Sequence, residues 1–242
     1  MFQFYQLPPL VKNIIIINII FYVATVSLST LGISLVDYLG LHQIQSSKFY
    51  PHQLITHFFM HGSIPHLFFN MFALWMFGKT LENIWGPKRF LTYYFVTAIG
   101  AALLHIVVTQ LKISNLIVAM DVENINSVIE NGANILQNRQ NYINSSMSKL
   151  NLLINIPTVG ASGAVFGVLL AFGLLFPNTL LYIYFAFPIK AKYFIIIYAI
   201  IELYLAIINN PNDNVAHFAH LGGMIFGYIL LKYWQKNKKH FY

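Results

Sequence analysis

Residues 160–177 read GASGAVFGVLLAFGLLFP, and this stretch decides the fold. It carries no charged residue, and its only polar side chain is that of Ser162. Because a bilayer core takes about 20 mostly apolar residues per helix, we expect a membrane helix that starts at Gly160 and ends before Pro177-Asn178. Glycine and alanine flank Ser162 and leave the nearby backbone open to close approach. A serine in such a helix commonly serves packing, so the stretch alone leaves the role of Ser162 open.

Further apolar runs lie on both sides of this stretch. They cover residues 10–36, residues 65–76 with an end near Gly78, and residues 90–108, 193–208 and 215–231. Together with the first stretch they predict six membrane helices. We therefore expect an all-α polytopic membrane protein, in which residues 1–242 form a single six-helix membrane domain.

The composition excludes several functional classes. Of the 242 residues, 57% are hydrophobic and 9% are charged, whereas an ordinary soluble domain is about 25% charged. These charges are too few to cover a surface that faces water, so lipid is the expected solvent. The chain has no cysteine, which excludes disulfides, thiol catalysis and zinc–thiolate sites.

The net charge of +7 does not indicate nucleic-acid binding, because the basic residues lie between the apolar runs and in the tail. If the N-terminus is inside, six spans place ten basic residues on the inner side: Lys12, Lys79, Lys88, Arg89, Lys190, Lys192, Lys232, Lys236, Lys238 and Lys239. The outer side then carries four: Lys48, Lys112, Arg139 and Lys149. The positive-inside rule therefore predicts cytoplasmic N- and C-termini, in a cell's inner (plasma) membrane.

Residues 109–158 differ in character from the rest of the chain. They are rich in Asn and Ser, and their apolar residues Val122, Ile125, Val128 and Ile129 recur at helical spacing. We expect one or two amphipathic helices at the outer membrane interface. The segment is interpreted as an extracytoplasmic insertion between the third and fourth spans, without chemistry of its own.

A histidine interrupts the last apolar run, within the sequence AHLGG that places His220 before Gly223. Gly223 and Gly227 form a small-x-x-x-small pair, for which the glycine-rich first stretch is the natural neighbour. That pairing would bring the His220 ring beside the Ser162 hydroxyl. A histidine there can take the serine proton and return it to a leaving amine. His217, one turn earlier, is the alternative base.

Two neutral donors share one face of the second predicted helix. His66 and Asn70 are four residues apart, so both side chains point the same way, and such donors suit an oxyanion hole. His57 and His61 precede this helix. We expect them in a polar loop that is buried in protein and tied by side-chain hydrogen bonds.

No carboxylate is expected beside His220. Asp213 lies seven residues earlier, roughly 10 Å along a helix, and Glu202 belongs to another span, nearer its middle. The sequence therefore predicts a Ser–His dyad and not a Ser–His–Asp triad.

These clusters together resemble the rhomboid family of intramembrane serine proteases, over about residues 10–234. The likeness rests on Gly160-Ala161-Ser162-Gly163, on His66-x-x-x-Asn70, on Ala219-His220 with Gly223 and Gly227, and on their order along six spans. Two features depart from it. The insertion at 109–158 is longer than in compact bacterial members, and residues 82–86 match the family only loosely.

The resemblance implies that Ser162 is the nucleophile and His220 its general base. The implied oxyanion donors are the Ser162 amide, His66 and Asn70. It also places the Phe166 ring against the catalytic histidine and gives His61 a role in organising the first loop. The family's His-x-x-Gly spacing fits His220 and makes His217 structural.

The implied reaction is hydrolysis of peptide bonds in or near transmembrane segments of membrane-protein substrates, with no cofactor and no metal. The expected partners are those substrates and the lipid bilayer, and no oligomeric state is predicted. One alternative is an intramembrane metalloprotease, because His57-x-x-x-His61 has ligand spacing, although the chain has no His-Glu-x-x-His. The other is a catalytically silent relative or a transporter, which would not need Ser162 and His220 to be paired.

Overall fold

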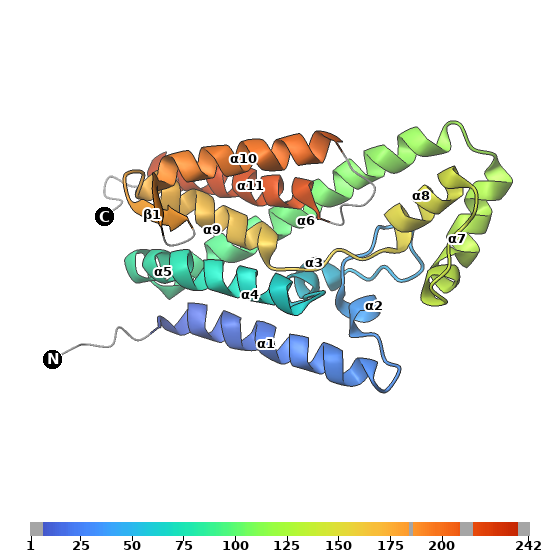
Figure 1. Ribbon diagram of the computed structural model, residues 1–242, viewed down its shortest axis with the longest axis horizontal. Coiled ribbons are helices and arrows are strands. Elements are labelled where there is room, and N and C mark those ends of the chain that lie inside the picture. Colours follow the sequence, from blue (N-terminus) through green and yellow to red (C-terminus); the bar gives the residue numbers. More distant parts are fainter. Residues whose placement is uncertain (1–6, 184–185, 209–214, 237–242) are drawn as a thin grey trace.

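The computed structural model describes residues 7–183, 186–208 and 215–236, and it is mostly helical. Its longer helices run side by side along the longest axis of the molecule (Figure 1). They are α1 (Pro9–Ser29), the continuous run of α4 (Ile64–Ala73), η2 (Leu74–Gly78) and α5 (Lys79–Trp85), then α6 (Pro87–Ile117), α9 (Ser162–Leu175), α10 (Ala191–Ile208) and α11 (His217–Lys236). The short elements α2 (Leu35–Leu39), α3 (Gln53–Thr56) and η1 (His57–Phe59) connect α1 to α4. Within the described ranges, α1, α6 and α10 are long and apolar enough to cross a membrane.

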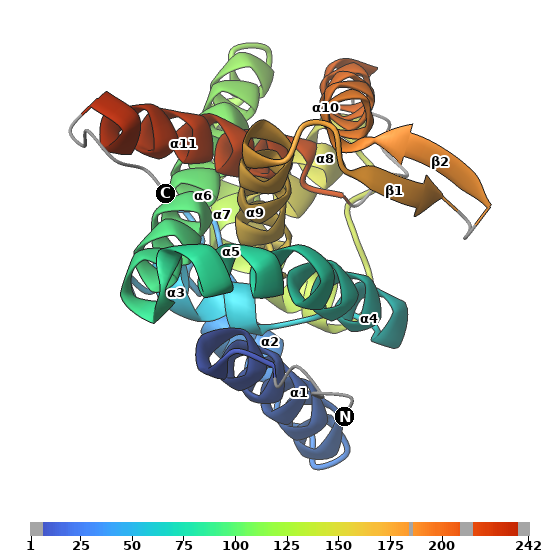
Figure 2. The same cartoon turned by 90° about the vertical axis from the view of Figure 1, so that its left-hand side faces the viewer.

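The predicted helix at 160–177 is confirmed as α9, which lies at the centre of the bundle. In the end-on view, α5, α6, α10 and α11 surround it (Figure 2). The helix begins at Ser162 and not at Gly160, because Gly160 has a φ of 126°, a conformation that no right-handed helix contains. The nucleophile candidate therefore stands at the first position of the central helix.

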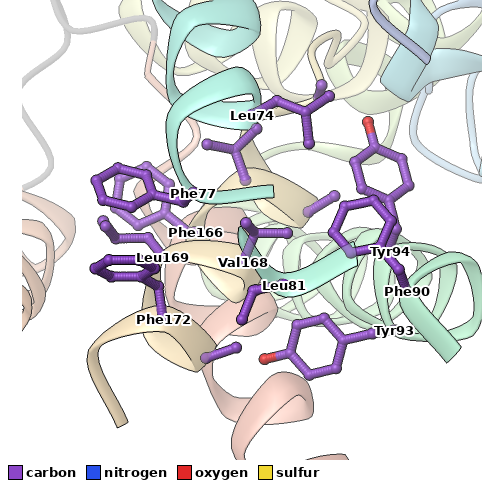
Figure 3. Packing of buried hydrophobic residues seen from close by; sticks show 14 of the residues in the cluster. Leu74, Phe77, Leu81, Phe90, Tyr93, Tyr94, Phe166, Val168, Leu169 and Phe172 are labelled. Atoms are coloured by element: carbon purple, nitrogen blue, oxygen red, sulfur yellow. The ribbon is translucent and has the colours of Figure 1, made fainter. Parts of the chain in front are cut away.

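Aromatic and aliphatic side chains fill the space around α9 (Figure 3). Phe77 of the α4–α5 run meets Phe172 of α9 edge to face, with ring centroids 4.9 Å apart. Tyr93 and Tyr94 of α6 are fully buried. The Tyr93 hydroxyl donates to the Gly167 carbonyl oxygen of α9 at 2.8 Å, which satisfies a polar group that has no water available in the core.

Two glycines bring α11 against its neighbours. A Cβ atom at Gly223 would overlap the carbonyl group of Gly163 in α9, and a Cβ atom at Gly227 would overlap the Tyr93 hydroxyl of α6. Only glycine permits such backbone approach at these positions. The predicted pairing of α11 with α9 is confirmed at Gly223, whereas Gly227 faces α6.

The ends of the first three predicted helices differ most from the observed ones. The first helix ends at Ser29, before Gly32, whose φ of 78° is left-handed. The second continues past Gly78 to Trp85 through the π-helical turn η2. The third runs on to Ile117, so the predicted insertion begins inside a helix.

The prediction of an all-α protein was wrong between α9 and α10. There β1 (Leu180–Ile183) and β2 (Phe187–Lys190) form an antiparallel hairpin, in which Leu180 pairs with Lys190. The segment between Pro177 and Ala191 is too short for a spanning helix. Within it, the backbone groups of β1 and β2 pair with each other instead, which meets the same requirement for hydrogen bonding.

The amphipathic helices predicted within residues 109–158 are present as α7 (Val122–Gln137) and α8 (Ser145–Asn155). They fold back toward the projecting end of α6 (Figure 1). A small separate core joins Ile113 of α6, Val128 of α7, and Leu150 and Ile154 of α8.

Candidate active site

Ser162 is held at the start of α9 by the extended segment before it. The N–H of Gly160 donates to the His57 carbonyl oxygen at 3.0 Å, which ties this segment to η1. The first turn of a helix leaves its N–H groups without intrahelical partners and carries the positive end of the helix dipole. The Ser162 hydroxyl therefore stands beside a region that favours developing negative charge.

His220 of α11 reaches this hydroxyl, with Nε2 2.9 Å from Ser162 Oγ. The His220 ring stacks on Phe166, with centroids 4.1 Å and planes 7° apart. Tyr198 of α10 stacks on Phe166 in turn, at 5.1 Å. The structure thus brings together Ser162, His220 and Phe166, the three residues that the family resemblance implies at one site.

A carboxylate also lies beside His220, and the prediction that none is in reach was wrong. Oε2 of Glu202 accepts a hydrogen bond from His220 Nδ1 at 2.8 Å. The error arose because Glu202 was placed by its position within its own helix, whereas the packing of α10 on α11 brings that part of α10 level with His220. Asp213, the other carboxylate considered, lies outside the described residues.

His217, the alternative base, is turned toward the same carboxylate. Its Nδ1 lies 2.7 Å from Glu202 Oε2, and its ring stands edge-on to that of His220 at 6.1 Å. All three side chains are buried. The contact with Ser162 belongs to His220, so the choice of His220 over His217 agrees with the geometry.

One pattern in the sequence does indicate that Glu202 faces inward. The buried residues of α10 are Ala191, Ile195, Glu202 and Ala206, which recur at helical spacing on one narrow stripe. Most of the rest of α10 is exposed and apolar. Small residues mark the face that packs against other helices, and a carboxylate on that face must find partners inside the protein.

The same three side chains are also a possible metal-ligand set. One ligand atom from each of Glu202, His217 and His220 lies within 4.8 Å of the other two. Tetrahedral zinc with bonds of about 2.0–2.1 Å would hold its ligand atoms roughly 3.3 Å apart. The observed N···O separations of 2.7 and 2.8 Å are those of hydrogen bonds, so a metal would require these side chains to separate.

His66 and Asn70 share one face of α4, as predicted. The amide Nδ2 of Asn70 donates to the His66 carbonyl oxygen at 2.9 Å, which uses one of its two N–H groups. The His66 ring lies against Gly160, where a Cβ atom would stand 2.7 Å from Nε2. The His66 ring is therefore close to the turn that leads into Ser162.

The first loop is polar, and His57 and His61 are buried in it, as predicted. The predicted side-chain hydrogen bond is found for His57, whereas both ring nitrogens of His61 lack a partner among the described residues. Leu41 and Thr158 form an isolated antiparallel bridge between this loop and the segment before α9, with N···O distances of 2.9 and 2.8 Å. Nδ1 of His57 donates to the Gln53 carbonyl oxygen at 2.7 Å. Burial lowers the pKa of His57 to about 4 and the pKa of His61 to about 3. Both histidines are therefore neutral at neutral pH.

A small cavity of about 10 Å³ adjoins Ser162, and its lining includes His57 and Thr158. A volume of this size holds about one water molecule, provided that polar groups are present to bind it. The hydroxyls of Ser162 and Thr158 supply such groups.

Sequence reasoning missed a second buried carboxylate, that of Glu82 in α5. Its two oxygens accept the backbone N–H groups of Leu10 and Val11 at 2.9 and 2.7 Å. These residues belong to the first turn of α1, whose N–H groups lack helical partners. The signal was the carboxylate itself, because an acidic residue at the end of an apolar run must be paired within the protein.

The chain is similar to known proteins over most of its length. Residues 48–236 match the family described as the Rhomboid domain. Rhomboid protein 1, mitochondrial, of Saccharomyces cerevisiae is 27% identical over 171 residues, which cover 71% of this chain and 38% of the relative. RHOMBOID-like protein 12, mitochondrial, of Arabidopsis thaliana is 27% identical over 172 residues, which cover 71% and 43%.

A third relative is Rhomboid-like protein 16, chloroplastic, of Arabidopsis thaliana. It is 25% identical over 179 residues, which cover 74% of this chain and 47% of the relative. In each of these three comparisons the chain spans less than half the length of the relative.

Proposed function

The chain belongs to the rhomboid family, and we propose that it is an intramembrane serine endopeptidase. The family match implies a polytopic helical membrane fold. The observation that carries the proposal is the 2.9 Å contact between Ser162 Oγ and His220 Nε2 at the start of the central helix. At 1.5 Å per residue, the 14 residues of α9 extend roughly 21 Å. Since a bilayer core is about 30 Å thick, a helix this short with its far end at one interface leaves Ser162 below the other.

In the proposed reaction, Ser162 Oγ attacks the carbonyl carbon of a peptide bond while its proton passes to His220 Nε2. The carbonyl π electrons move onto oxygen and form an oxyanion. As this intermediate collapses, the C–N bond breaks and His220 gives the proton to the departing amine. Water then repeats the same steps on the acyl-enzyme, which releases the acid and restores Ser162.

The proposed oxyanion donors are the Ser162 N–H, the His66 ring and the second amide N–H of Asn70. The approach of His66 to Gly160 and the common face of His66 and Asn70 support this set. Removal of one such donor typically lowers turnover by about 10²–10³-fold.

The proposed substrates are membrane proteins cleaved in or near a transmembrane segment. A helix hides its peptide carbonyls in its own hydrogen bonds, so the substrate must unwind locally before Ser162 can attack. Cleavage sites rich in glycine, serine or proline fit this requirement, because these residues weaken or interrupt a helix in its interior.

For the membrane arrangement we propose six spans, with α9, α11 and the α4–α5 run added to α1, α6 and α10. Both ends of the chain then lie on the side that carries more lysine and arginine. Lys238 and Lys239, which contribute to this bias, lie outside the described residues. The expected plasma-membrane location has no counterpart in the relatives' names, which are mitochondrial or chloroplastic.

Because the chain has no cysteine, introduced cysteines report the orientation directly. We expect Ser145→Cys in α8 and Lys88→Cys in α6, both at exposed positions, to react with a membrane-impermeant maleimide from opposite sides of a sealed vesicle. Labelling of both from the same side would contradict the six-span topology.

The function is tested with detergent-solubilised protein and a fluorescent reporter that contains a transmembrane helix. The wild-type protein should cleave the reporter, and a fluorophosphonate should add one adduct per chain on intact-mass analysis. Ser162→Ala should lose both properties while keeping the helical circular dichroism of the wild type. Cleavage or labelling that persists in Ser162→Ala would exclude Ser162 as the nucleophile.

A further inference from the structure

We propose that Glu202 is a positioning residue of the catalytic site, and that the charge of its carboxylate sets the turnover of Ser162 through His220. This inference rests on the proposed protease function and deepens it. It replaces the expected pair of residues by a linear chain of three: Glu202 Oε2 to His220 Nδ1 at 2.8 Å, and His220 Nε2 to Ser162 Oγ at 2.9 Å.

The chain fixes the tautomer of His220. A neutral imidazole carries one N–H, on either Nδ1 or Nε2. A carboxylate can only accept, so the contact with Glu202 keeps the proton on Nδ1. Nε2 is then the bare nitrogen, and it faces the Ser162 hydroxyl, as a general base requires.

The carboxylate also stabilises what His220 becomes during the reaction. Glu202 is 5% exposed, and a buried charge is costly unless hydrogen-bonded partners surround it. When His220 takes the proton of Ser162, the neutral donor beside the carboxylate becomes an imidazolium. The attraction between the two charges is stronger at that point than in the resting state, so it lowers the barrier and not merely the energy of the bound substrate.

His217 gives the carboxylate a second donor. Its Nδ1 lies 2.7 Å from Glu202 Oε2, the oxygen that also accepts the hydrogen bond from His220. The two rings therefore hold Glu202 Oε2 between them. The other titratable or charged groups near His220 and Glu202 are Tyr198 on α10, His66 on α4, and His105 and Lys112 on α6, which line a pocket with His217. Among these described groups, Glu202 supplies the carboxylate.

The test compares two buried carboxylates in the full-length protein. Glu202→Gln removes the charge beside His220 and preserves the shape of the side chain. Glu82→Gln makes the same change in α5, where the carboxylate accepts backbone N–H groups and not a histidine. Each variant is assayed for kcat and KM of reporter cleavage, for the rate at which a fluorophosphonate labels Ser162, and for thermal unfolding.

For Glu202→Gln we expect kcat to fall by about 10²–10⁴-fold with KM changed less than threefold, because the lost interaction is strongest in the transition state. Labelling of Ser162 should slow by a similar factor. Glu82→Gln should lower the unfolding temperature and leave kcat unchanged.

Wild-type kcat in Glu202→Gln would overturn the proposal. If that variant does not fold, Glu202→Asp replaces it: a carboxylate one methylene shorter should lower kcat at least tenfold at constant KM, and wild-type kcat would again overturn the proposal. Loss of wild-type activity with a chelator and recovery with zinc would also overturn it, by assigning the three side chains to a metal. Cleavage that persists in Ser162→Ala would instead show that the proposed serine mechanism, on which this inference rests, is wrong.

Discussion

Glu82 and Glu202 are the same residue type at nearly the same burial, 2% and 5% exposed, yet the structure uses them differently. Glu82 accepts the N–H groups of Leu10 and Val11, which never change charge. Glu202 accepts from the rings of His217 and His220, which can. The comparison teaches that burial of a carboxylate identifies a constrained position, whereas the chemistry of its partners separates a helix anchor from a component of a reaction.

The largest expected effect falls on the histidines that face Glu202. His220→Ala should lower kcat by something on the order of 10⁶-fold, as loss of the base does in other serine proteases. His217→Ala should stay within tenfold of the wild type, because it leaves the contacts of His220 with Glu202 and Ser162 intact. Reporter cleavage by the two purified variants measures both. A dead His217→Ala beside an active His220→Ala would reverse the assignment of the base.

The next effect tests whether a residue of α4 takes part in the reaction together with Glu202 and Ser162. Asn70→Ala should raise the barrier by about 2.7–4 kcal/mol if its amide donates to an oxyanion. The loss should appear in kcat, because the oxyanion exists only after attack. Steady-state kinetics on the reporter separate the two parameters. A rise in KM alone would make Asn70 a substrate-binding residue.

A smaller effect is expected at Glu82, and it should be one of stability. Glu82→Ala removes two hydrogen bonds to the start of α1, which should cost about 1–3 kcal/mol of unfolding free energy. Thermal unfolding in detergent measures the loss, and the activity of the folded fraction serves as the control. If kcat falls while the unfolding temperature is unchanged, Glu82 is not a purely structural anchor.

The last effect concerns the pH dependence of stability, at a buried histidine that has no carboxylate beside it in the described contacts. Burial lowers the pKa of His57 in the folded state to about 4, from about 6.5 in the unfolded chain. The unfolded state therefore binds more protons between these values, and stability falls as pH drops through that window, by up to roughly 1.4 kcal/mol per pH unit. Thermal unfolding from pH 7 to pH 4 should show this decline. The decline should be shallower in His57→Asn, and an unchanged slope would contradict the assignment.

Much of this arrangement follows from local sequence signals. The charge-free stretch around Ser162 predicts the central helix, and Gly223 predicts the close contact that delivers His220. The first signal works because it depends only on the residues of one helix. The second works because glycine has the smallest side chain. The extent of α6 to Ile117 and the hairpin that starts at Leu180 were not predicted, because a polar composition or a short apolar run fits several structures equally well.

Glu202 could not be placed by the same means. Its contact with His220 joins residues 18 positions apart in the chain, on two helices whose relative height depends on how α10 packs. A shift of one turn, 5.4 Å, would separate the two side chains. Sequence spacing within a helix determines which face a residue occupies, whereas the vertical alignment of neighbouring helices is a property of the whole bundle.

The bridge between Leu41 and Thr158 has a consequence for how the length of this chain can vary. It closes the insertion just before the nucleophile, as Ile117 and α6 anchor its other end. Because both ends of the insertion are fixed, a change in its length should hardly move the residues outside it. Each doubling of a flexible loop costs only about 0.6 kcal/mol in closure entropy. We therefore expect that segments within residues 118–154 can be gained or lost in evolution, or replaced by design, with little change in the geometry at Ser162. Asn155 belongs to the fixed part, because it accepts a hydrogen bond from Ser46 of the first loop.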